Sequence, residues 1–76
     1  MITTAILIKR FTSDGLMEMW EHVAIGKVYL VDLATIRMAQ FYNIDQKSFH
    51  MKEIITVVDE SREPLGWFPV ECLEIL

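Results

Sequence analysis

Cysteine, proline and glycine are scarce in this chain, which has one, two and three of them among 76 residues. A single cysteine cannot form an internal disulfide, which excludes a secreted disulfide framework and favours a reducing, cytoplasmic setting. The glycines stand singly, so no glycine-rich phosphate loop can form. Residues 1–8 are apolar but lack a basic leader and bilayer-spanning length, and we expect a strand there, with no membrane anchor.

Basic residues are also few. Seven Lys and Arg stand against eleven Asp and Glu, a formal net charge of −4, whereas nucleic-acid-binding proteins gather positive charge on one face. We therefore expect no direct contact with nucleic acid. The size allows one domain over residues 1–76. Because 53% of residues are apolar and the interior of so small a domain is limited, some large apolar side chains must lie at the surface.

Short runs of β-branched and aromatic residues between turn residues predict a mainly β fold. The expected strands are residues 3–11, 27–33, 52–59, 65–68 and 73–76. Turn residues separate them at 12–15 and 59–64. In 27–33 both alternating sets of side chains are largely apolar, which predicts a central strand.

Residues 34–44 carry mixed signals. Ala34, Met38 and Ala39 favour helix, whereas Phe41 and Tyr42 favour strand. A long bent strand or hairpin arm is the preferred interpretation, followed by a polar loop over residues 43–48. A helix stays open as the alternative.

The C-terminal tail holds the most recognisable pattern, Gly66-Trp67-Phe68-Pro69. Pro69 has no amide donor, so the strand that contains Trp67 and Phe68 must stop there, before an apolar pattern resumes at Leu73. This succession resembles the end of a Src homology 3 barrel, where glycine, two apolar residues and proline lead through one helical turn into the last strand.

A second segment, Gly26-Lys27-x-Tyr29-x-Val31, is similar to the point where the first long loop of those barrels enters the second strand. Together the two motifs imply an all-β fold: a small antiparallel barrel of about five strands with an enlarged middle connection. Both motifs also look like those of small cytoplasmic accessory proteins of phages and prophages.

The resemblance does not extend to binding of proline-rich peptides. Of the groove that holds them in this family, only Pro69 matches. The third strand opens with Ile54 and Ile55 in place of a tryptophan, and Cys72 stands where a tyrosine is expected. The resemblance therefore implies the fold without that activity.

No catalytic, cofactor or metal site can be assembled from the residue pattern. Cys72 with His22 or His50 would supply a thiolate and its base, but nothing in the spacing brings them together, and the three are too dispersed for zinc. We predict a protein that is not an enzyme. A cysteine-dependent enzyme is the weakest alternative.

We expect the chain to work by protein contact, with a basic host protein, with itself, or both. The candidate contact residues are apolar anchors with an acidic rim: Met17, Met19, Trp20, Trp67, Pro69, Glu63 and Glu71. If Phe68 faces the core, alternation points Trp67 outward. A structural alternative, in which both tryptophans close the barrel ends, stays open.

A second function stays open as well. The acids of the C-terminal hairpin would imitate nucleic-acid phosphates and inhibit a host enzyme that handles DNA or RNA.

Overall fold

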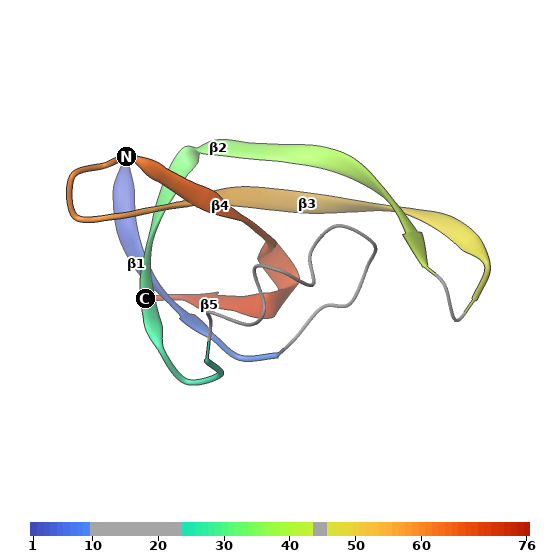
Figure 1. The fold of residues 1–76 in the computed structure, drawn as a ribbon, viewed down its shortest axis with the longest axis horizontal. Coiled ribbons are helices and arrows are strands. Elements are labelled where there is room, and N and C mark those ends of the chain that lie inside the picture. The colour runs from blue at the N-terminus through green and yellow to red at the C-terminus, as the bar shows by residue number, and fades with distance from the viewer. Residues whose placement is uncertain (10–23, 44–45) are drawn as a thin grey trace.

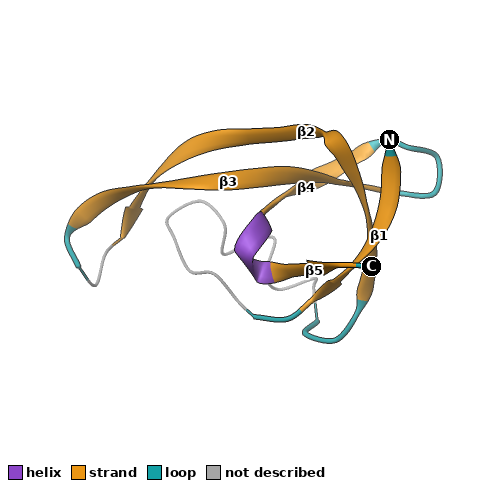
Figure 2. Cartoon of the chain, turned by 180° about the vertical axis from the view of Figure 1, so that it is seen from behind, coloured by secondary structure: helices purple, strands orange, loops and turns teal. Residues whose placement is uncertain are grey.

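A computed structural model describes residues 1–9, 24–43 and 46–76. They form one antiparallel sheet of five strands: β1 (Ile2–Leu7), β2 (Val28–Asn43), β3 (Ser48–Val58), β4 (Pro64–Pro69) and β5 (Leu73–Ile75). A single 3-10 turn, Val70–Cys72, joins β4 to β5 (Figure 2). The strand order is β4-β3-β2-β1-β5, which leaves β4 and β5 at the two edges of an open sheet. The prediction of a mainly β, antiparallel fold is confirmed.

β2 is the middle strand, as its two apolar faces predicted. Val31 is fully buried and Tyr29 and Leu33 pack beside the core, whereas Val28 on the other face is exposed. Gly26 lies just before this strand with φ +91°. Space around its Cα is open, so the left-handed backbone is what calls for glycine here.

The tail also follows its prediction. Phe68 is buried opposite Ile55, and pairing of β4 with β3 ends at Pro69. The chain then makes its 3-10 turn, and Leu73 pairs with Leu7. Most of the core lies on this side of the sheet and consists of Ala5, Leu7, Val31, Ile55, Val57, Phe68, Cys72 and Leu73, whereas Phe41 and Ile54 of the same cluster lie on the other face.

The preferred interpretation of residues 34–44 as a long bent strand or hairpin arm is confirmed as far as Asn43, where β2 ends, and the helical alternative is wrong for residues 34–43. Two predicted boundaries need correction. β3 begins at Ser48 rather than at residue 52, because the two strands pair from Arg37 opposite Ile54 to Asn43 opposite Ser48. These ladder hydrogen bonds override the weak β propensity of the individual residues. β1 ends at Leu7 rather than at residue 11, because its pairing with β5 ends at Leu7.

The paired residues 37–43 and 48–54 form a hairpin that we call the arm, and the remaining described residues form the body. Figure 1 shows the arm running along the longest axis of the molecule, away from β1, β4 and β5. The chain measures 37 Å along this axis against 23 and 20 Å across it. The middle connection of the sheet is therefore a projecting two-stranded ribbon.

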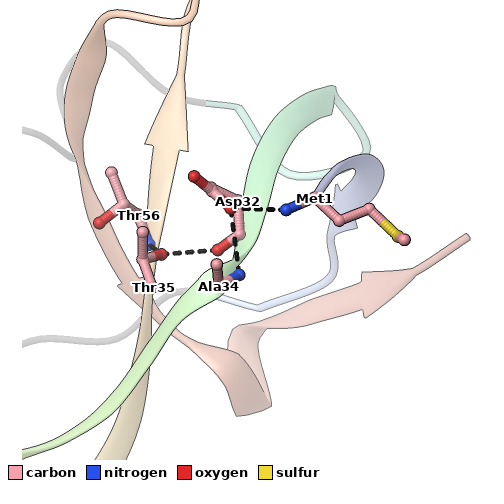
Figure 3. Close-up of polar contacts among 5 residues, drawn as sticks. All are labelled: Met1, Asp32, Ala34, Thr35 and Thr56. Atoms are coloured by element: carbon pink, nitrogen blue, oxygen red, sulfur yellow. Dashed lines mark hydrogen bonds and ion pairs between the residues drawn. The ribbon is translucent and has the colours of Figure 1, made fainter.

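The arm begins at an irregularity in β2. Pairing jumps from Asp32 opposite Thr56 to Arg37 opposite Ile54. The Thr35 hydroxyl donates a hydrogen bond to the Asp32 carbonyl oxygen (2.6 Å) and accepts one from the Thr56 backbone N–H (2.9 Å), as Figure 3 shows. A side chain thus takes the place of a missing backbone partner.

The Asp32 carboxylate holds the same bend. Its Oδ1 accepts the Ala34 N–H at 3.0 Å and the amino group of Met1 at 3.2 Å (Figure 3). The Ala34 hydrogen bond, and then the one from that amino group, lower the pKa of the carboxyl group. The anion therefore persists to lower pH than an ordinary aspartate.

The irregularity changes which residues of β2 face the core side of the sheet. Before it, Val31 pairs with the buried Val57, whereas after it Met38 pairs with Glu53. Cross-strand partners share a face, and side chains alternate along β3, so Glu53 lies on the same side as Val57. Odd-numbered residues of β2 face the core side in the body, and even-numbered ones do so in the arm.

Candidate functional site: the two faces of the arm

One face of the arm consists of exposed side chains, and we call it the open face. It is built from three cross-strand pairs: Met38 with Glu53, Gln40 with Met51, and Tyr42 with Phe49. It continues the core side of the sheet beyond the body. A surface that forms the core elsewhere in the sheet is left in water here.

The apolar members of the open face are large. Phe49 is 66% exposed, Met51 58%, Met38 56% and Tyr42 38%. The rings of Tyr42 and Phe49 meet edge to face with centroids 5.1 Å apart. This contact covers part of each ring and leaves both available to a further surface.

The opposite face of the arm is covered. Phe41 and Ile54 are buried there, and Ala39 packs against the same cluster. The ring centroids of Phe41 and Trp67 are 5.2 Å apart, which ties the arm to β4. The arm is thus anchored through one face only.

An ion pair strengthens this anchor at the base of the arm. The Lys52 ammonium donates to the Glu71 carboxylate, and Lys9 lies 3.7 Å from the same group. The hydrogen bond from Lys52 is the main reason that the pKa of Glu71 is lowered. A hollow of about 390 Å³ lies beside the pair, lined by Met51, Lys52, Glu53, Val70 and Glu71. The open face therefore ends at a recess between the arm and the 3-10 turn of the body.

The structure describes four of the seven residues predicted to bind a partner, which are Trp67, Pro69, Glu63 and Glu71. Met17, Met19 and Trp20 lie outside the described residues. Pro69 is fully buried, and Trp67 is half-buried against Phe41 where alternation predicted a ring in solvent. Both acids are exposed, Glu63 in the turn before β4 and Glu71 in its ion pair.

None of the four apolar residues of the open face was among the predicted contacts. A signal exists for two of them, since Phe49 and Met51 alternate with polar residues. Met38 and Tyr42 show no such signal, because Phe41 between them is also apolar and is the buried residue.

The described residues give no support to cysteine chemistry. Cys72 is fully buried, and burial, with a smaller contribution from the Glu71 carboxylate, raises the pKa of its thiol to about 11. An activated cysteine needs the opposite shift. The Nε2 of His50 is 2.9 Å from the Ser48 hydroxyl on the arm, and His22 lies outside the described residues.

Within residues 1–9, 24–43 and 46–76, no three His, Cys, Asp or Glu side chains come together as a metal site would require. The same part of the chain holds no helix with the length and hydrophobicity of a membrane span.

Neither protein-family models, nor curated proteins, nor solved structures include a match to this chain.

Proposed function

We propose that this protein is a small protein-binding module that acts by contact, and that the open face of the arm is its contact surface. The observation that supports this is the exposure of Met38, Tyr42, Phe49 and Met51 on the core side of a sheet. Methionine and aromatic side chains are enriched where proteins bind one another. Exposed apolar patches of this kind commonly mark such sites.

The stability of the arm supports the same proposal. A two-stranded ribbon is marginally stable in water by itself. The arm has its Phe41 face packed on the body and its open face uncovered. A partner on the open face would bury the second side and give the ribbon the two-sided packing of a sheet core.

The test compares three proteins: wild type, the double variant Phe49→Lys/Met51→Lys, and the control Leu65→Lys. Leu65 is 61% exposed and lies on β4, outside the arm. Each protein is immobilised and exposed to a host-cell lysate, and the proteins that it retains are quantified by mass spectrometry. Proteins retained by wild type and the control should be lost from the double variant. Equal retention by all three would contradict a role for the open face.

We also infer that the sheet is of the Src homology 3 type. Support comes from the strand order and from the 3-10 turn that follows Pro69 and leads into the last strand. Closure into a barrel would bring the backbones of the two edge strands, β4 and β5, together. Nuclear Overhauser contacts between backbone protons of these two strands test this, and their absence would leave an open sheet.

The alternative of an acidic inhibitor that imitates nucleic acid has less support. The carboxylate of Asp59 accepts the backbone N–H groups of Ser61 and Glu63, both at 2.9 Å, and Glu71 binds lysines. Two acids of the C-terminal hairpin thus serve the fold. A basic host protein as partner, a phage or prophage source and a cytoplasmic location stay predictions, and the genes that neighbour this one would test the source.

A further inference from the structure

We propose that the open face is covered by the open face of a second copy of this chain. Two arms would pack face to face and antiparallel, related by a two-fold axis. This inference rests on the proposed function, since it takes the open face to be a contact surface and names its occupant.

The axis that fits best passes between two neighbouring cross-strand pairs, Gln40–Met51 and Tyr42–Phe49. Each Met51 then lies over Phe49 of the other copy, and each Gln40 over Tyr42. Thioether sulfur packs favourably against aromatic rings, and an amide can exchange a hydrogen bond with a phenol hydroxyl. The open face is therefore complementary to itself under this rotation.

Charge selects the antiparallel arrangement. Glu53 lies at the base of the open face, and Lys47 lies in the turn at the tip of the arm. Antiparallel arms bring each Glu53 opposite Lys47 of the other copy, whereas parallel arms would place both Glu53 carboxylates at one end of the pair and both Lys47 ammonium groups at the other. The antiparallel arrangement also places the two bodies at opposite ends of the pair. This separation reduces repulsion between chains that each carry a formal charge of −4.

The area available is sufficient for a modest dimer. A fully exposed side chain of this size presents about 200 Å², so the exposed fractions of Met38, Tyr42, Phe49 and Met51 amount to about 440 Å² per chain. Two copies would bury about 900 Å² before Gln40 and Glu53 are counted, close to the roughly 1,000 Å² that a specific interface needs. Such an area predicts a dimer that dissociates on dilution.

Sedimentation equilibrium over a concentration series tests the proposal. Wild type should reach a dimer. The double variant Phe49→Lys/Met51→Lys should raise the dimer dissociation constant by at least about 30-fold, as loss of central anchors does. Leu65→Lys should leave it unchanged. Because the substituted side chains are exposed, circular dichroism should show all three proteins folded.

A charge reversal tests the antiparallel geometry. Glu53→Lys alone and Lys47→Glu alone should each weaken the dimer by about 5-fold, because each turns two attractive pairs into like-charge pairs. The double reversal should restore most of the loss. Additive losses in the double reversal would exclude this arrangement.

Two results would overturn the proposal. A wild-type chain that stays monomeric up to about 1 mM would show that a second copy does not cover the open face. In that case, loss of retained partners from Phe49→Lys/Met51→Lys would still support the proposed function. A dimer that persists unchanged in the double variant would place the interface elsewhere. Equal retention of partners by all three immobilised proteins is the separate result that would contradict the proposed function.

Discussion

Replacing Phe41 with alanine should release the arm from the body. The Phe41 side chain is 8% exposed, packs with the buried core and lies 5.2 Å, centroid to centroid, from the ring of Trp67. Alanine would leave a cavity under the arm and leave Trp67 without its aromatic neighbour. Without this contact, the Phe41 face of the arm would be exposed to solvent, as the open face is.

The size of the effect follows from burial. Removal of a buried phenylalanine side chain costs about 3–5 kcal/mol, and we expect about 3 kcal/mol because Phe41 lies where the arm meets the body and its surroundings can relax. A chain of this length has a total stability of about 4–11 kcal/mol, so the loss is a large share. At about 4–8 °C per kcal/mol, the midpoint of thermal unfolding should fall by roughly 12–24 °C.

Phe49→Ala is the matched control, since it removes the same side chain from the same hairpin. Phe49 is 66% exposed, so the substitution should cost less than about 0.5 kcal/mol in the monomer. Both variants are compared with wild type by urea unfolding, followed by far-ultraviolet circular dichroism at low micromolar concentration, where self-association contributes little. Equal costs for the two substitutions would refute the assignment of faces, and with it the change of alternation at the irregularity in β2.

Three further predictions follow. Gly26→Ala should cost about 1 kcal/mol in urea unfolding, because φ is +91° while space for a Cβ is open; no loss would show that the turn can change conformation. Thr35→Val should cost about 1–3 kcal/mol, since it leaves the Thr56 N–H unpaired, whereas Thr35→Ser should retain most of the stability. The pKa of Cys72 rises from 9.0 to about 11 on folding, so in this range the folded state keeps a proton that the unfolded chain loses. The free energy of unfolding should therefore fall as the pH rises from 9 to 11. Cys72→Val should flatten that decline, and an unchanged slope would contradict the prediction.

The pattern of the tail could be interpreted correctly because its constraints are local. Pro69 ends β4 whatever surrounds it, since it has no N–H to donate. The alternation that buries Phe68 follows from strand geometry once Ile55 is taken as core. The same alternation pointed Trp67 to solvent, yet its ring is half-buried. What covers it is Phe41 of the arm, a residue far away in sequence.

The open face could not be predicted for a related reason. Residues 33–36 of β2 lie opposite Ile55 alone, and this irregularity depends on Thr35 finding the N–H of Thr56 in another strand. It shifts the side-chain alternation, so that Phe41 is buried and its neighbour Tyr42 is exposed. Propensity and spacing in residues 34–44 are compatible with either outcome.

By itself, the amino-acid sequence determined the mainly β class, the central place of β2 and the stop at Pro69. These depend on backbone chemistry and on alternation within single strands, which neighbouring residues decide. The tertiary structure decided the length of the arm, the face that anchors it and the face that stays exposed. Those depend on pairing between β2 and β3 and on packing against Trp67. These contacts join residues that are distant in the sequence, so the pattern of neighbouring residues does not predict them.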